Sequence, residues 1–79
     1  MITYAEAIAK RIMSLCQEKN MTINRLAIRS GLKQSTLDNV IKGNTKSTGI
    51  RTLSLISQGF EMTVSELLNF PEINEATDE

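Results

Sequence analysis

The sequence predicts an all-α fold, a compact domain of five helices. Its 79 residues are enough for one domain with a small core. Only 4% of the residues are aromatic, and Ala, Leu and Ile dominate the apolar set, which favours compact helical packing over a large β-barrel core. Apolar residues recur with the 3.6-residue period of a helix, and no segment shows the alternation of a strand.

The first helix is expected over residues 4–20. Thr3 and Glu6 have the spacing of a capping box, in which each side chain accepts a backbone N–H of the other residue. The apolar stripe of this helix consists of Ile8, Ile12, Leu15 and Cys16.

Two short helices should follow, over residues 23–30 and 33–42. Thr22 is a suitable N-cap for the first of them, and Gly43 is a good signal for the end of the second. Between them stands Gly31, which can take the left-handed backbone of a sharp turn without the cost of about 1–2 kcal/mol that other residues bear.

The side chains of this pair also fit a tight crossing. Ala27 is small where two helices must approach closely, and Leu37 and Val40 point back into the core. This spacing is the helix-turn-helix pattern, whose second helix lies in the major groove of DNA.

A fourth helix is expected over residues 49–60, with Thr48 as its N-cap. Its inward-facing residues should be Ile50, Leu53, Ile56 and Phe60.

A short fifth helix should begin after Thr63. Thr63 and Glu66 form a second capping box, and Met62 with Leu67 has the spacing of a hydrophobic staple. The dipeptide Phe70-Pro71 ends the helix. The domain therefore spans residues 1–70, and residues 71–79 form an acidic tail that is expected to be disordered.

The net charge of zero conceals a strong segregation of charge. All nine basic residues lie between Lys10 and Arg51, where the only acidic residues are Glu18 and Asp38, so this window carries a net charge of +7. From Glu61 onward there are six acidic residues and no basic one. Because the helix-turn-helix lies in the basic window, the pattern favours an anionic partner over an ordinary solvated surface.

With these elements in place, the chain resembles the Cro/repressor-type helix-turn-helix proteins, also called the XRE family. The resemblance covers roughly residues 5–69 and includes residues 62–68, which are similar to the start of the family's fifth helix. It implies a phage-repressor-like, five-helix DNA-binding domain, often a dimer on a near-palindromic site. The matching residues are Thr22, Leu26, Ala27, Gly31, Gln34, Ser35, Thr36, Leu37, Val40, Gly43, Thr52, Leu53 and Ile56.

Three positions depart from the family pattern. Cys16 and Ile41 stand where the family commonly has an Arg–Glu ion pair, and an apolar contact can replace such a pair without loss of stability. Ile23 replaces a Gln that touches DNA in the family. Glu61 replaces a Gly, so a left-handed backbone at this position would carry some strain.

The resemblance and the helical period together assign DNA contacts. Asp38 is ambiguous, because it could accept from cytosine N4 or could instead pair with Arg29 or Lys42. Among the basic residues that are not assigned a contact below, Lys10, Arg11, Lys19, Arg25 and Arg29 contribute at most to a general positive electrostatic field. The expected base contacts are Lys33, Gln34, Ser35 and Asn39. The expected phosphate contacts are Thr22, Asn24, Thr36, Lys42, Asn44, Lys46, Ser47 and Thr48.

These features predict a sequence-specific transcriptional regulator of double-stranded DNA, prokaryotic or phage, acting as a repressor if it occupies a promoter. A homodimer, at least on DNA, is expected from the resemblance. The alternative is an antitoxin-like or other protein-interaction module of the same fold. The acidic tail and the apolar residues Met13, Leu55 and Phe70 could then contact a protein partner.

Enzymatic function is not expected. The sequence has no His, no cluster of metal ligands, no phosphate-binding glycine loop and no nucleophile beside a base, so no metal or cofactor is predicted. The single cysteine, Cys16, cannot form an internal disulfide and lies on an apolar stripe, which favours a buried packing role over a redox sensor. No apolar run approaches the roughly 18 residues of a membrane span. A cytoplasmic protein is therefore expected, in the bacterial cytosol or nucleoid.

Overall fold

The computed structural model describes residues 2–43 and 48–77, and this part of the chain is helical as predicted. Asn44, Lys46 and Ser47 lie outside the described residues, as does the end of the predicted tail. The helices are α1 (Tyr4–Glu18), α2 (Ile23–Ser30), α3 (Gln34–Ile41), α4 (Ile50–Gly59) and α5 (Val64–Leu67), followed by the 3-10 helix η1 (Pro71–Glu75).

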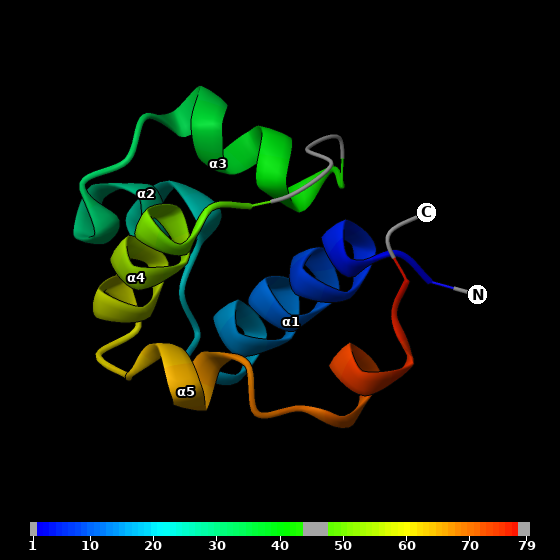
Figure 1. Cartoon of the computed structure of the whole chain (residues 1–79). Coiled ribbons are helices and arrows are strands. Elements are labelled where there is room, and N and C mark those ends of the chain that lie inside the picture. The colour runs from blue at the N-terminus through cyan, green and yellow to red at the C-terminus, as the bar shows by residue number, and fades with distance from the viewer. Residues whose placement is uncertain (1, 44–47, 78–79) are drawn as a thin grey trace.

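The helices surround one apolar centre. Helix α2 packs against α4, while α1 packs against α3 on one side and η1 on another (Figure 1). Each of the five α-helices or its C-cap contributes a side chain with almost no exposed surface. Burial of one such side chain stabilises the fold by roughly 1.5–3 kcal/mol, which explains how helices this short persist. These side chains are Ile12, Leu26, Leu37, Ile56, Phe60 and Leu67.

Both predicted capping boxes are present. At the start of α1, the Glu6 N–H donates to Thr3 Oγ1 at 3.1 Å and the Thr3 N–H donates to Glu6 Oε1 at 2.9 Å. At the start of α5, the equivalent bonds of Thr63 and Glu66 measure 3.0 and 2.8 Å. These bonds hold the pKa of each glutamate below its ordinary value, because they favour the charged carboxylate.

The start of α4 differs from the prediction. Gly49 is the N-cap in place of Thr48, and no side chain caps the helix. Ile50 was expected to face inward but is 68% exposed. The apolar period continues to Ile50, but burial begins only at Leu53 because no other element covers the first turn.

Four of the described helices are followed by a left-handed residue. The φ angles are 55° at Asn20, 69° at Gly31, 70° at Gly43 and 60° at Glu61. Helix α1 therefore ends earlier than predicted, and Glu61 has the left-handed backbone at which a side chain carries some strain. After Asn20, Gly31 and Glu61, the next residue donates its N–H to the carbonyl five positions back, and its side chain packs against the core. Those next residues are Met21, Leu32 and Met62.

Helices α2 and α4 approach each other closely at Gly59, a residue that the sequence did not single out. A Cβ added there would meet Ser30 Oγ and would lie 3.1 Å from Leu26 Cδ1. Ala27 is buried as predicted. The close crossing therefore depends on a glycine of α4 as well as on the small residue of α2.

The predicted disorder of the acidic tail is wrong for residues 71–77. The Tyr4 N–H donates to the Thr77 carbonyl and the Thr77 N–H donates to the Ile2 carbonyl, each at 2.9 Å. Ile73 packs against the core and Ala76 is buried. The polar composition concealed these two apolar contacts and the backbone pairing that joins the two ends of the chain (Figure 1).

Arg11 connects α1 to the end of α5. Its Nε and Nη2 each donate at 2.9 Å, to the carbonyls of Leu67 and Glu66 respectively. The guanidinium also lies 5.3 Å from the centre of the Phe70 ring. The side chain therefore bonds to two carbonyls at the end of α5, and that of Glu66 also accepts the Asn69 N–H at 3.2 Å.

Candidate nucleic-acid interface

Helix α3 is held by its inner face and by the turn before it. Leu37 and Val40 are buried, and Ile41 packs against the core. Gly31 allows the sharp turn from α2, and Leu32 then enters the core with its N–H bonded to the Ala27 carbonyl at 3.0 Å. These contacts give α3 a defined orientation on the surface.

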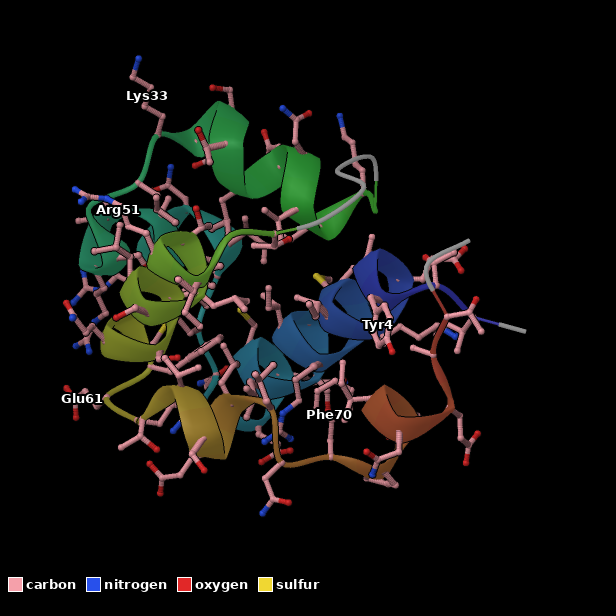
Figure 2. All side chains as sticks on the ribbon, in the orientation of Figure 1. Tyr4, Lys33, Arg51, Glu61 and Phe70 are labelled. Carbon is pink, nitrogen blue, oxygen red and sulfur yellow. The ribbon has the colours of Figure 1, made fainter. Side chains whose placement is uncertain are left out.

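The outer face of α3 contains the predicted base-contact residues. Lys33 is the N-cap residue, has an extended backbone and extends away from the domain (Figure 2). Thr36 and Asp38 are half-buried at the edges of this face. Its exposed polar residues are Lys33, Gln34, Ser35, Asn39 and Lys42.

The start of α2 lies beside this face. Thr22 is exposed, and its Oγ1 accepts the Arg25 N–H at 3.1 Å, which leaves its hydroxyl hydrogen able to donate to a phosphate. Asn24, predicted to contact phosphate, donates through Nδ2 to Gln34 Oε1 at 3.0 Å. Side chains of α2 and α3 thus meet at the expected interface.

Asp38 has a different partner from those considered in the sequence. Its Oδ1 accepts from Gln34 Nε2 at 3.1 Å, and the ion pair of Arg29 is with Glu61 at 3.2 Å. The spacing of four residues between Gln34 and Asp38 is one at which helical side chains meet, so this pair was detectable. The contact between Asn24 and Gln34 could not be detected from the sequence, because it depends on how α2 and α3 pack.

The remaining predicted phosphate contacts are only partly described. Lys42 follows α3 and is exposed, and Thr48 is half-buried before α4. The structure therefore brings Thr22, Asn24 and Thr36 to the helix-turn-helix, with Lys42 at the far end of α3.

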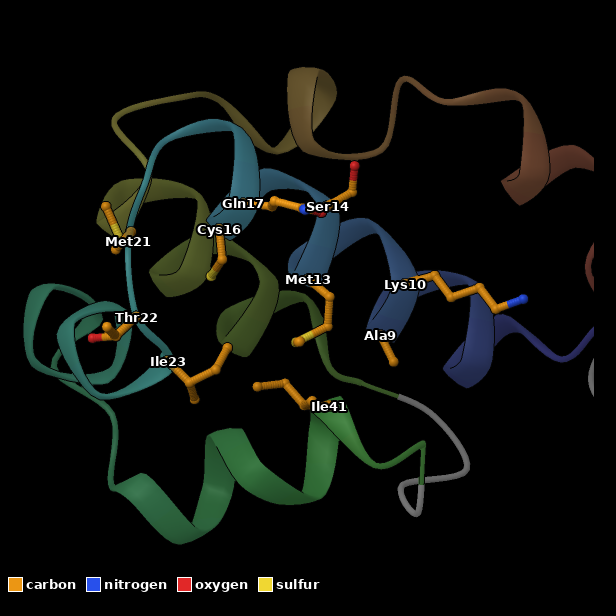
Figure 3. Close-up of a pocket in the computed structure, with 10 residues that line it drawn as sticks. All are labelled: Ala9, Lys10, Met13, Ser14, Cys16, Gln17, Met21, Thr22, Ile23 and Ile41. Atoms are coloured by element: carbon orange, nitrogen blue, oxygen red, sulfur yellow. The ribbon is translucent and has the colours of Figure 1, made fainter.

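A shallow apolar groove lies between α1 and α3, at the position of the missing family ion pair. Met13 of α1 and Ile41 of α3 point toward each other across it, with Cys16 and Ile23 nearby (Figure 3). Burial raises the pKa of the Cys16 thiol, which keeps it protonated and unreactive and supports the packing role.

The part of the chain that the structure describes contains neither a candidate metal site nor a candidate membrane-spanning helix. Residues 2–43 and 48–77 hold no group of three or more His, Cys, Asp or Glu side chains placed to bind a metal ion. No helix within those ranges is long and apolar enough to cross a membrane.

A short helix with an exposed polar face, mounted through a tight turn on a second helix, defines a helix-turn-helix DNA-binding domain. The chain belongs to the Cro/C1-type HTH DNA-binding domain family, whose model matches residues 11–72.

Solved structures with the same fold agree with this assignment. The crystal structure of the prophage Lp1 protein 11 is 33% identical, with a TM-score of 0.83 over 96% of this chain and 100% of that one. A tyrosine-to-phenylalanine mutant of the restriction-modification controller protein C.Esp1396I is 24% identical and shows the same fold, with a TM-score of 0.74 over 85% of each chain. A comparison with curated proteins found no significant match.

Proposed function

We propose that this protein is a sequence-specific, double-stranded DNA-binding transcriptional regulator that inserts α3 into the major groove. The observation that supports this most directly is the exposed polar face of α3, held in a defined orientation by its buried residues Leu37 and Val40. Lys can donate to guanine, and Gln and Asn can bond to both N6 and N7 of adenine. The proposed base contacts are Lys33, Gln34, Ser35 and Asn39.

Phosphate contacts would set the register of α3 in the groove. Thr22, the N-cap of α2, and Lys42, the C-cap of α3, are both exposed, so each could contact a phosphate beside the groove. Asn24, Thr36 and Thr48 complete the proposed set among the described residues. The protein would act in the bacterial cytosol or nucleoid, where it represses a gene by occupying the promoter.

A homodimer on a near-palindromic operator is part of this proposal. The recognition helices of a helix-turn-helix dimer contact half-sites centred about one turn of DNA apart, roughly 34 Å. Selection of bound duplexes from a random pool at about 150 mM salt tests both points. We expect enrichment of two inverted half-sites with this spacing. Weak, salt-sensitive binding without any enriched sequence would contradict the proposal.

Gln34→Ala tests the assignment of a base contact. We expect it to cost about 1–3 kcal/mol on the selected site and to relax the preference at one base pair, because the bidentate contact is lost. Competition binding with single-base-pair variants of the site measures this. An equal loss on all sequences would show that Gln34 does not contact a base.

A protein-interaction module is the second candidate. Exposed apolar residues favour it, because Met13 is 47%, Ile28 69% and Ile50 68% exposed. Leu55 and Phe70, which the sequence suggested for this role, are half-buried, and Arg11 lies over the Phe70 ring. Co-purification of a toxin-like partner, together with the absence of a selected DNA site, would favour this candidate.

A further inference from the structure

Three polar side chains form a continuous hydrogen-bond chain across the face that is proposed to contact bases. Asn24 Nδ2 donates to Gln34 Oε1 at 3.0 Å, and Gln34 Nε2 donates to Asp38 Oδ1 at 3.1 Å. We call these three residues the amide relay. It connects α2 to α3 and includes a proposed base-contact residue, Gln34, as its middle member.

The carboxylate determines the direction of the relay. An ionised Asp38 can only accept hydrogen bonds, so the Gln34 amide must turn its nitrogen toward it. The Gln34 oxygen then faces α2, and Asn24 must present its own nitrogen. Without Asp38, both amides could rotate by half a turn together and still bond to each other.

The Gln34 amide keeps bonding capacity for a base. Nε2 has a second hydrogen and Oε1 a second lone pair, so one donor and one acceptor remain. Adenine presents the complementary pair, the N6 amino group and N7, in a fixed order along its major-groove edge. An amide rotated by half a turn would present donor and acceptor in the reverse order.

We propose that Asp38 is a positioning residue that fixes the direction of the Gln34 amide and thereby determines which base edge α3 accepts. This inference rests on the proposed DNA-binding function. It also explains a carboxylate on a surface meant for DNA, where phosphate repulsion lowers affinity. Among residues 2–43 and 48–77, Asp38 has no ion pair, and its Oδ1 is bonded to Gln34.

The test compares base preference in four proteins: the wild type, Asp38→Asn, Asp38→Glu and Glu18→Gln. Asn at position 38 keeps the size of the side chain but both donates and accepts, so either direction of Gln34 is allowed. Glu keeps an acceptor-only carboxylate. Glu18 is an exposed carboxylate in the last turn of α1, so its substitution removes the same charge away from α3.

The measurement is competition binding of the selected operator against single-base-pair variants at the position that Gln34→Ala identifies. The wild type, D38E and E18Q should prefer one base pair by about 5- to 150-fold, the discrimination of one bidentate contact. D38N should reduce this preference to less than about threefold, while its affinity for random DNA stays equal or rises because a negative charge is lost.

Two results would overturn the inference while leaving the proposed function intact. One is a D38N protein with the wild-type preference at every position, and the other is an equal loss of affinity on all sequences. If the wild type enriches no site at all, the proposed function fails, and the inference fails with it.

Nuclear magnetic resonance of the DNA-free protein tests the relay without a binding assay. The side-chain Nε2 group of Gln34 should show restricted motion on the picosecond-to-nanosecond timescale in the wild type and greater motion in D38N. Free motion of this group in the wild type would contradict the inference even if D38N failed to fold.

Discussion

Gly59 and Ser30 determine how closely α4 approaches α2. Ser30 is 4% exposed, and its Oγ has no hydrogen-bond partner among the described residues. A Cβ at position 59 would meet this oxygen, and the Ser30 backbone nitrogen would lie 3.3 Å away. The site therefore combines a glycine required by sterics with a buried hydroxyl that contributes no hydrogen bond.

Gly59→Ala should lower the free energy of unfolding by about 1–2 kcal/mol, because overpacking outweighs the gain of about 1 kcal/mol in helix propensity. Urea denaturation measures this. Ser30→Ala alone should be close to neutral, and the double variant should recover part of the loss because the overlapping oxygen is gone. An unchanged or higher midpoint for Gly59→Ala would show that the two helices can separate without cost.

At the scale of single elements, α5 depends on contacts beyond its own few residues. A helix this short is unstable by itself, because its N–H and carbonyl groups lack intrahelical partners. The capping box of Thr63 and Glu66 bonds to the N–H groups at its start, and Arg11 donates to two carbonyls at its end. The capping box is formed by residues close together in the sequence, whereas Arg11 belongs to α1.

Arg11→Met should destabilise the fold by about 1–2 kcal/mol, because two charge-assisted hydrogen bonds at a partly exposed site are lost while the apolar stem is kept. Arg11→Lys should be intermediate, since one ammonium cannot reproduce the geometry of two guanidinium donors. Lys10→Met, at the exposed neighbouring position, is the matched control and should change little. Thermal and urea unfolding measure the series, and equal effects at positions 10 and 11 would contradict the role of Arg11.

The two capping boxes predict a pH dependence of stability. The pKa values of Glu6 and Glu66 are lower in the folded protein than their ordinary value of 4.5. Their contribution to the free energy of unfolding is therefore present when the pH is above the ordinary pKa, and it is lost as the pH falls through the folded-state pKa values. The urea midpoint should therefore decrease between about pH 5 and pH 3. In the Glu6→Gln/Glu66→Gln variant this decrease should be smaller, and an identical pH profile would rule out the two carboxylates as its source.

At the scale of the whole molecule, the two ends of the chain close the domain. Ile2, Thr3 and Tyr4 lie beside Thr77, and η1 packs against α1. The family match ends at residue 72, so part of this closure lies beyond the matched region.

Removal of residues 71–79 should lower the free energy of unfolding by about 2–3 kcal/mol, because Ile73 and Ala76 leave the core and the backbone pairing is lost. Removal of residues 78–79 alone keeps the contacts of Ile73 and Ala76 and is the control. Differential scanning calorimetry of both shortened proteins checks this. A melting temperature unchanged by the longer deletion would show that η1 does not stabilise the domain.

The features that the sequence predicted well depend on interactions a few residues apart. The two capping boxes, the turn at Gly31, the bounds of α2 and the exposed face of α3 follow from residue type and helical period. Ile50 is exposed although its position on the apolar stripe predicts burial, because periodicity indicates a face but does not show where the covering helices end. The tail was misjudged, because its polar composition outweighed two apolar residues.

The sequence by itself determined the fold class, the helix-turn-helix and the set of polar residues that α3 exposes. Only the tertiary structure decided which side chains far apart in the sequence contact one another. The bond from Asn24 to Gln34 spans 10 positions and that from Arg11 to Leu67 spans 56, so neither is encoded in any local spacing. The physical reason is that a local pattern sets the conformation of a segment, whereas the bond between Asn24 and Gln34 depends on where packing places α2 against α3.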